Sequence, residues 1–219
     1  MCARASYDKQ LEDLQREILR MGSLVESAVD QAVHSLVRQD LKLAEAVIKG
    51  DDSVNVIRRG IEESCLVLIA TQQPIAKDLR RIIAAISIVT DLERMGDHAA
   101  AIAKVTKRLA NQPLIKPLID IPKMARLAQA MVRNVLDSYV KGDVDMALQT
   151  CQADDEIDHL YKAVFDELVE IMINDRTTIN QATYLLFVAR YLERIADHAT
   201  NIGENVIYLE TGERKELNL

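Results

Sequence analysis

The sequence predicts an all-α fold in which six long helices form two tandem, similar three-helix bundles. Apolar residues make up 49% of the chain but aromatic residues only 4%, so the core must be aliphatic. Seven glycines and four prolines are too few for the many turns of a strand-rich fold. Apolar residues also recur at three- and four-residue steps over long stretches, as on the buried face of a helix.

Clear start and stop signals delimit the first three helices. The first covers residues 7–39, and Asp40 is placed to cap the second, which covers residues 41–71. A Gln-Gln-Pro sequence ends the second helix, and the third covers residues 75–110. Two prolines in segment 111–117 interrupt the helical pattern. We therefore predict two domains, covering residues 1–112 and 118–219.

The last three helices have similar signals. The fourth covers residues 122–141 and opens on Pro122. Gly142 and Asp143 predict a C-cap followed by the N-cap of the fifth helix, which continues to residue 174. A turn at 175–178 leads into the sixth helix, which Gly212 terminates after residue 210.

The two halves of the chain repeat each other. The sequence Leu-Glu-Arg-Met-Gly-Asp-His-Ala at 92–99 returns as Leu-Glu-Arg-Ile-Ala-Asp-His-Ala at 192–199, 100 positions later. In the middle helices, residues 51–57 match residues 154–160 at an offset of 103. This pattern indicates a duplicated three-helix unit and not an array of many short repeats.

The most informative motif is Glu/Asp-x-x-x-Asp, which places two carboxylates one helical turn apart. In the second and third helices of the two halves it occurs as the pairs Glu93/Asp97, Glu193/Asp197 and Asp154/Asp158, and in a weakened form that ends on an amide as Asp51/Asn55. The motif follows the apolar stripe of its helix by one position, as Glu93 follows Leu92. Because one residue turns a helix by about 100°, the motifs lie on the same side of the apolar stripe in every helix. In each half, the motif-bearing sides of two neighbouring helices could therefore face each other.

Clustered carboxylates repel each other unless a cation joins them. Like charges one turn apart destabilise a helix by about 0.2–0.5 kcal/mol per pair, and four oxygen-bearing side chains suit a hard or borderline metal. A single such pair is usually a solvated surface feature, and Arg94 and Arg194 could neutralise these carboxylates as surface salt bridges. The repetition at one geometric position favours the metal site over that alternative.

Other candidate residues carry less weight. His98 and His198 lie a further 100° around their helices, so we expect them to be exposed or structural and not metal ligands. The pair Glu26/Asp30 has no acidic counterpart in the second half, so we expect it at the surface. Cys65 is expected in the core, and three scattered cysteines indicate neither a disulfide framework nor a zinc knuckle.

Composition also excludes several classes of protein. The formal net charge is −7 and no basic stripe is present, so nucleic-acid binding is not expected. The longest apolar stretches, such as residues 82–89, are far shorter than the roughly 20 residues of a membrane span. The charged first twenty residues do not form a secretory signal, so we expect a soluble, cytoplasmic protein without membrane insertion. Nucleotide-binding and hydrolase motifs are absent, so no catalytic or cofactor-binding residue is predicted.

Three segments together closely resemble the PhoU family. They are the doubled Glu-Arg-x-x-Asp-His motif at 93–98 and 193–198, and the sequence Gln-Gln-Pro-Ile-Ala-Lys-Asp-Leu-Arg at 72–80. The resemblance covers essentially the whole chain. It implies a non-enzymatic, self-associating regulator, expected as a homodimer, that restrains the high-affinity phosphate transporter and helps keep a phosphate-sensing histidine kinase in its repressing state. The implied partners are that kinase and the ATPase subunit of the transporter.

The resemblance also implies metal cations, iron or zinc, in clusters that can be multinuclear. By position, it assigns a first site to Asp51, Asn55, Glu93 and Asp97. It assigns a second site to Asp154, Asp158, Glu193 and Asp197, with Asn201 within reach. Because Asn55 supplies an amide in place of a carboxylate, we expect weaker cation binding at the first site. Two alternatives to a non-enzymatic, metal-binding regulator remain open: a carboxylate-bridged metalloenzyme and a metal-free helical scaffold.

Overall fold

The structure, a computed structural model, describes residues 2–215 and 217, so the outermost residues of the two predicted domains lie outside it. Within that part, every regular element is helical, which confirms the all-α prediction. The helices are α1 (Cys2–Arg38), α2 (Leu41–Gln72), α3 (Ala76–Arg108), α4 (Asp120–Lys141), α5 (Val144–Gln152), α6 (Asp154–Asn174), the short 3-10 helix η1 (Arg176–Thr178) and α7 (Ile179–Thr211).

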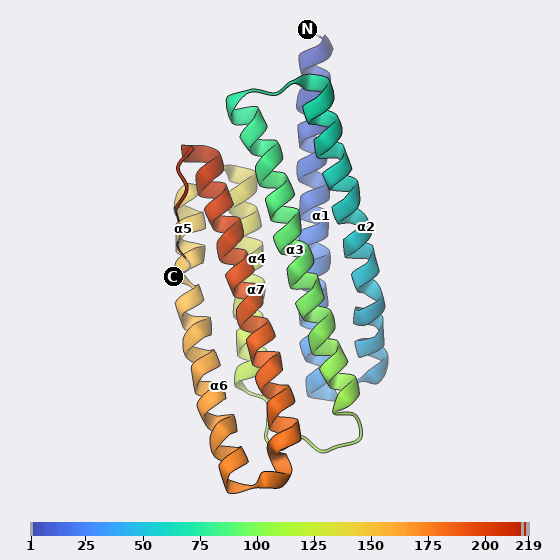
Figure 1. The fold of residues 1–219 in the computed structure, drawn as a ribbon, viewed down its shortest axis with the longest axis vertical. Helices are drawn as coiled ribbons and strands as arrows, with labels where there is room; N and C mark the ends of the chain where they lie inside the picture. Colours follow the sequence, from blue (N-terminus) through green and yellow to red (C-terminus); the bar gives the residue numbers. More distant parts are fainter. Residues whose placement is uncertain (1, 216, 218–219) are drawn as a thin grey trace.

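The helices form two similar bundles that lie side by side (Figure 1). The first bundle consists of α1–α3 and the second of α4–α7. In the middle, α3 and α7 pack against each other in opposite directions, with α2 at one edge and α6 at the other. Behind them α1 packs against α4. Equivalent helices thus pair across the junction, which gives the duplicated chain a near two-fold arrangement.

The predicted helix caps are confirmed. Asp40 Oδ1 accepts hydrogen bonds from the amides of Lys42 and Leu43, each at 3.0 Å. Asp143 Oδ1 accepts from the first turn of α5 at 2.9 Å. Gly142 has a φ of 65° at the end of α4, a left-handed conformation that glycine adopts without steric cost. These contacts satisfy backbone groups that a helix terminus leaves without partners.

The prediction of one continuous fifth helix is wrong, because the helix breaks at Ala153 into α5 and α6. The amide of Ala153 donates to Thr150 O at 3.1 Å, and the amide of Glu156 donates to Ala153 O at 3.3 Å. Acidic residues occupy the first turn of α6, where the positive end of the helix dipole stabilises them. The equivalent segment of the first bundle lies inside the uninterrupted helix α2.

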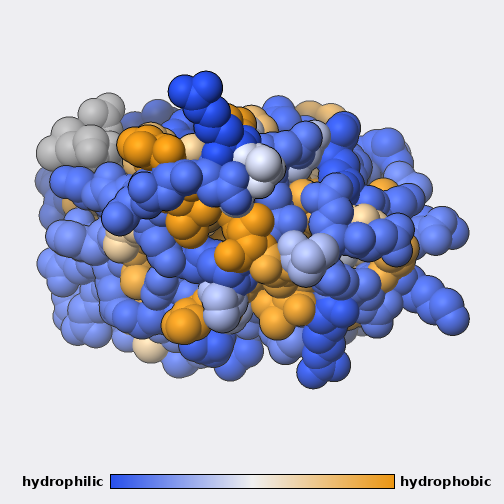
Figure 2. Space-filling model, turned by 90° about the horizontal axis from the view of Figure 1, so that it is seen from below, coloured by the Kyte–Doolittle hydropathy of each residue, from blue (hydrophilic) through white to orange (hydrophobic). Residues whose placement is uncertain are grey.

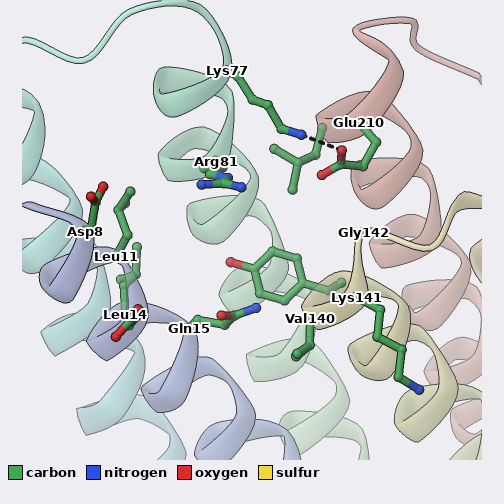
Figure 3. Close-up of a pocket in the computed structure, with 13 residues that line it drawn as sticks. Asp8, Leu11, Leu14, Gln15, Lys77, Arg81, Val140, Lys141, Gly142 and Glu210 are labelled. Carbon is green, nitrogen blue, oxygen red and sulfur yellow. Dashed lines mark hydrogen bonds and ion pairs between the residues drawn. The ribbon is translucent and has the colours of Figure 1, made fainter.

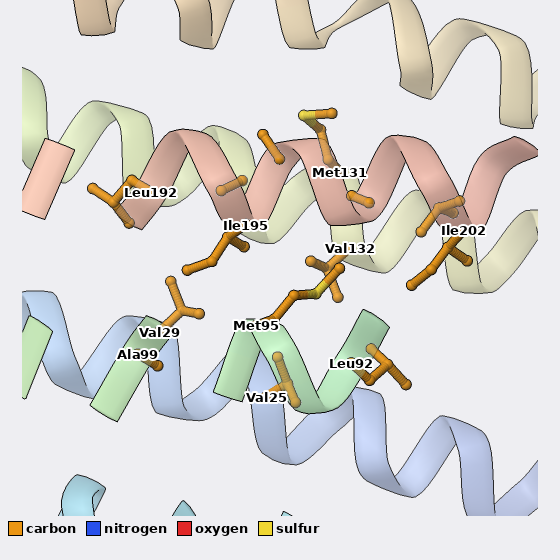
Figure 4. Packing of buried hydrophobic residues seen from close by; sticks show 14 of the residues in the cluster. Val25, Val29, Leu92, Met95, Ala99, Met131, Val132, Leu192, Ile195 and Ile202 are labelled. Atoms are coloured by element: carbon orange, nitrogen blue, oxygen red, sulfur yellow. The ribbon is translucent and has the colours of Figure 1, made fainter. Parts of the chain in front are cut away.

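One aliphatic core joins the two bundles. Figure 4 shows that side chains of α1, α3, α4 and α7 meet there, among them Val25, Met95, Met131 and Ile195. The predicted apolar stripes of α3 and α7 are buried, and Cys65 is buried as expected. Gly50 and Ala153 directly precede the motifs of the middle helices, where the apolar stripe is expected, and they are instead exposed. Since α2 and α6 lie at the edges of the molecule, their buried stripes are narrower than those of α3 and α7.

The lower end of the molecule exposes apolar side chains (Figure 2). The start of α2, the linker between the bundles, and the turn between α6 and α7 lie at this end. Their exposed apolar residues are Leu41, Ile119, Ile173 and Ile179. Such a group of apolar side chains is typical of a protein contact surface. Among the described residues, no helix has the length and apolar character needed to cross a membrane.

Candidate metal centre

The first predicted group lies where α2 packs against α3. Asp51 and Asn55 come from α2, and Glu93 and Asp97 from α3. A Cβ atom added to Gly96 would lie 3.3 Å from Asp51 Oδ1, so Asp51 approaches α3 between the two acidic residues of that helix. Burial and then the charge of Asp97 raise the pKa of the Asp51 carboxyl above its ordinary value.

The second predicted group lies where α6 packs against α7. Asp154 and Asp158 come from α6, and Glu193 and Asp197 from α7. Burial raises the pKa of Asp154 to about 7, and the negative charges of Asp158, Asp197 and Glu193 act in the same direction. Burial followed by the charge of Asp197 also raises the pKa values of Asp158 and Glu193. The helices therefore bring these four carboxylates into one electrostatic environment.

Four buried carboxylate oxygens have no hydrogen-bond partner within the described residues. They are one oxygen from each motif-bearing helix: Asp51 Oδ1, Glu93 Oε2, Asp154 Oδ1 and Glu193 Oε2. Three of the residues that carry them are more than nine-tenths buried, with Glu93 8%, Asp154 7% and Glu193 7% exposed. Arg94 Nε lies 3.6 Å from Glu93 Oε2 and Arg194 Nε lies 4.0 Å from Glu193 Oε2, so these two oxygens have an ion pair but no hydrogen bond. A buried charged oxygen without a hydrogen bond is costly. The repeat of this feature at equivalent positions in both bundles fits a cation that these oxygens could ligate.

The arrangement does not by itself form a finished coordination sphere. Across residues 2–215 and 217, no three His, Cys, Asp or Glu side chains are arranged so that they could hold a metal ion as they stand. A cation would have to draw these carboxylates together. The donor set consists of carboxylate and amide oxygens, the ligands that hard divalent cations prefer.

Two arginines that sequence reasoning did not single out contact the buried glutamates. Arg58 Nη1 donates to Glu93 Oε1 at 2.9 Å, and Arg190 donates to Glu193 Oε1. The spacing of three residues between Arg190 and Glu193 is visible in the sequence, whereas the contact of Arg58 joins two helices and required the tertiary structure. The salt bridges considered as the alternative to a metal site are present, as Arg194 Nη1 lies 3.0 Å from Asp197 Oδ2 and Arg94 Nη1 lies 3.5 Å from Asp97 Oδ2.

The two amide residues assigned to the sites have different surroundings. Asn55 Nδ2 donates to Asp51 Oδ2 at 3.3 Å, within the first group. Asn201 Nδ2 donates to Asp91 Oδ1 at 3.3 Å, across the junction with α3. The structure thus places Asn55 beside a predicted ligand and gives Asn201 a partner on the other bundle. Their role as metal ligands stays a prediction.

The duplicated histidines lie between α3 and α7 and are partly buried. His98 stacks on Tyr191 with ring centroids 5.6 Å apart, and its centroid lies 5.7 Å from that of His198. His198 Nδ1 lies 3.0 Å from Asp91 Oδ1. These contacts give the histidines a structural role at the junction of the two bundles, one of the two roles expected from the sequence.

The pair Glu26/Asp30 is only partly at the surface. Asp30 is exposed, as expected, but Glu26 is mostly buried and forms an ion pair with Arg133 of α4. Arg133 occupies the position equivalent to Asp30 in the second half, so one half has a base where the other has an acid. Glu26 therefore helps to join α1 to α4.

A cavity of about 440 Å³ lies away from both acidic groups, where α1, α3, α4 and α7 meet at one end of the molecule (Figure 3). Lys77 Nζ lies 2.6 Å from Glu210 Oε2 across this cavity and links the two bundles. None of the predicted site residues lines it.

Comparison with known proteins agrees with this architecture. The PhoU domain family matches residues 18–106 and 121–206. The "Phosphate-specific transport system accessory protein PhoU homolog" of Clostridium acetobutylicum is 44% identical over 98% of this chain and 99% of its own length. The crystal structure of PhoU from Pseudomonas aeruginosa superposes with a TM-score of 0.91 at 38% identity, covering 94% of this chain and 100% of that one. The phosphate transport system regulatory protein PhoU from Streptococcus pneumoniae gives a TM-score of 0.89 at 33% identity, covering 96% and 99%. The chain belongs to the PhoU family.

Proposed function

We propose that this protein is a cytoplasmic, non-enzymatic regulator that restrains high-affinity phosphate uptake and binds metal cations at its two acidic groups. The names of its relatives support a role in phosphate transport, since they are called accessory or regulatory proteins of that system. The proposed partners are the ATPase subunit of the transporter, a phosphate-sensing histidine kinase, and a second copy of the chain. The exposed apolar residues at the lower end supply a surface suited to such contacts.

The metal-binding part of the proposal rests on the four buried carboxylate oxygens that receive no hydrogen bond. The first site would use Asp51, Asn55, Glu93 and Asp97, and the second would use Asp154, Asp158, Glu193 and Asp197, with Asn201 beside it. The protein would bring the carboxylates together, and iron or zinc would supply the positive charge that removes their repulsion. The metal would then join α2 to α3 and α6 to α7.

Elemental mass spectrometry on untagged protein tests the metal sites. We expect more than one iron or zinc per chain, with part of the metal lost from a Glu93→Gln/Asp97→Asn variant and part from a Glu193→Gln/Asp197→Asn variant. A matched control is Glu26→Gln/Asp30→Asn, which changes a pair of the same spacing outside both groups. Folded, metal-free wild-type protein would contradict this part of the proposal.

Phosphate-dependent repression of the transporter, measured in cells carrying the same variants, tests the regulatory part. We expect repression to weaken in both site variants and to persist in the control. A normal response in site variants that have lost their metal would support the alternative of a metal-free scaffold, in which arginines alone neutralise the acidic groups.

A further inference from the structure

We infer that a bound cation stiffens the second bundle much more than the first, because Arg58 and Arg190 position the two buried glutamates in different ways. This inference rests on the metal binding proposed above. Arg58 and Arg190 lie outside the predicted ligand sets. According to this inference, cation binding at two acidic groups of similar sequence changes the rigidity of the two bundles to different extents.

In the first bundle, the arginine already connects the two helices of the site. Arg58 belongs to α2, and its Nη1 donates to Glu93 Oε1 on α3 at 2.9 Å. Its Nε donates to Glu62 Oε1 on α2 at 2.9 Å, which holds the guanidinium in place. Charge-assisted hydrogen bonds of this kind are stronger than neutral ones. The pair α2–α3 is therefore linked across the site without any metal.

In the second bundle, the arginine and the glutamate lie on the same helix. Arg190 donates to Glu193, three residues later on α7. Arg190 reaches α6 through the face of Tyr161, with Cζ 5.6 Å from the ring centroid. This contact is weaker and less directional than a charge-assisted hydrogen bond.

The two arginines occupy exchanged positions in the duplicated sequence. Tyr161 is the equivalent of Arg58, and Thr90 is the equivalent of Arg190. Each bundle thus keeps one guanidinium hydrogen-bonded to the Oε1 atom of its buried glutamate and leaves the Oε2 atom without a hydrogen bond. The next residue in the chain, Arg94 or Arg194, lies 3.6 or 4.0 Å from that Oε2 atom in the same way in both bundles. Arg58 and Arg190 are positioning residues that present Oε2 to a cation, but only Arg58 also links two helices.

The helix break at Ala153 supplies a second, independent asymmetry. Asp154 is the first residue of α6 and follows directly on that break. Its equivalent Asp51 lies inside the continuous helix α2. A cation held by Asp154 and Glu193 would fasten the start of α6 to α7 at the point where the helix is interrupted. A cation held by Asp51 and Glu93 would join two helices that are already continuous and linked.

Hydrogen–deuterium exchange tests the inference. The full chain is stripped of metal with a chelator, exchanged with and without Zn²⁺, and zinc content is measured on the same samples. We expect zinc to slow amide exchange about tenfold around residues 150–160 and less than about threefold around residues 47–57, because exchange reports local opening. In the metal-free protein, residues 47–57 should already exchange more slowly than residues 150–160.

Exchanging the arginines gives the matched controls. In the variant Tyr161→Arg/Arg190→Thr, the second bundle acquires the arrangement of the first, and the effect of zinc around residues 150–160 should shrink. In the variant Arg58→Tyr/Thr90→Arg, the effect around residues 47–57 should grow. Circular dichroism and thermal unfolding verify that each variant folds. If a variant does not fold, the comparison of wild-type protein with and without zinc still tests the inference.

The outcomes separate this inference from the proposed function. Zinc bound at both sites with equal slowing of exchange in the two bundles would overturn the inference and leave the metal sites standing. Absence of bound zinc and iron would overturn the proposed metal function. In that case, equal exchange of the two segments in the metal-free protein would overturn the arginine asymmetry as well.

Discussion

His198 Nδ1 lies 3.0 Å from Asp91 Oδ1 at the junction of α7 and α3. The equivalent contact in the near two-fold arrangement joins His98 to Tyr191, whose rings stack with centroids 5.6 Å apart. Asp91 and Tyr191 occupy equivalent positions in the two halves. One histidine therefore faces a carboxylate, and the other faces an aromatic ring. Two copies of one motif have acquired different environments.

Acidification should destabilise the protein through His98. Burial, and then the neighbouring His198, lower the pKa of His98 to about 4 from an ordinary value of 6.5. Between these values the unfolded chain binds a proton that the folded protein does not, so this contribution to stability is present above about pH 6.5 and is lost as the pH falls toward 4. Between pH 7 and pH 5 the loss is on the order of 2 kcal/mol. Urea unfolding of wild type and His98→Gln at both pH values measures it, and equal losses in the two proteins would contradict the assignment.

Replacing Asp154 by asparagine should stabilise the metal-free protein. Burial and nearby carboxylates raise the pKa of Asp154 to about 7 in the folded state, so the folded protein holds a proton that the unfolded chain releases near pH 4. Stability from this group is present below about pH 4 and is lost as the pH rises to 7, a trend opposite to that of His98. We expect Asp154→Asn to gain on the order of 1–3 kcal/mol at pH 8 and little at pH 4.

The exposed neighbour Asp155 supplies the control for that change. Chemical denaturation of Asp155→Asn in the same buffers should show a difference from wild type within about 0.5 kcal/mol. If both variants shift stability by the same amount, the effect belongs to the net charge of the chain and not to the buried position. With saturating zinc, the gain of Asp154→Asn should turn into a loss, because the variant lacks one of the proposed ligands.

A methyl group at Gly203 should disturb the packing of α7 on α5. A Cβ atom there would lie 2.5 Å from Cys151 Sγ, closer than two such atoms can approach. We expect Gly203→Ala to cost about 1–3 kcal/mol in thermal or urea unfolding. The double variant Gly203→Ala/Cys151→Ala should cost less than the sum of its parts, since removing the sulfur makes room for the methyl group. Strict additivity would show that the two positions do not compete for the same space.

Two other glycines should respond to alanine in opposite ways. Gly142 has a φ of 65°, and a Cβ atom there would lie 3.2 Å from Glu210 Cδ, so Gly142→Ala should destabilise by about 1–2 kcal/mol. Gly50 lies on the exposed face of α2 with no atom near its added Cβ, so Gly50→Ala should stabilise by about 0.5–1 kcal/mol. Because the added methyl group at Gly142 meets Glu210, it could also disturb the ion pair between Glu210 and Lys77. Lys77→Met removes that pair alone, and because the pair is partly exposed we expect a loss of less than about 1 kcal/mol.

Much of the fold could be predicted because its signals are local. Asp40 and Asp143 stand where a side-chain oxygen can reach the first free amides of a helix, and Gly142 stands where the chain must turn left-handed. The apolar stripes on α3 and α7 follow helical periodicity closely enough to identify the core. The break at Ala153 could not be predicted in this way, because alanine favours helix and the acidic residues that follow it are compatible with either outcome.

The acidic groups, too, have features that the sequence predicts and features that depend on the tertiary structure. The spacing of four residues determines that Glu193 and Asp197 lie on one side of a helix, and the repeat of the motif determines that this side is used in both halves. Only the tertiary structure decided that Glu93 receives its guanidinium from α2 while Glu193 receives one from its own helix. Periodicity within a helix is set by neighbours in the chain, whereas contacts between helices depend on how the helices pack, and packing is the sum of many weak interactions between residues far apart in the sequence.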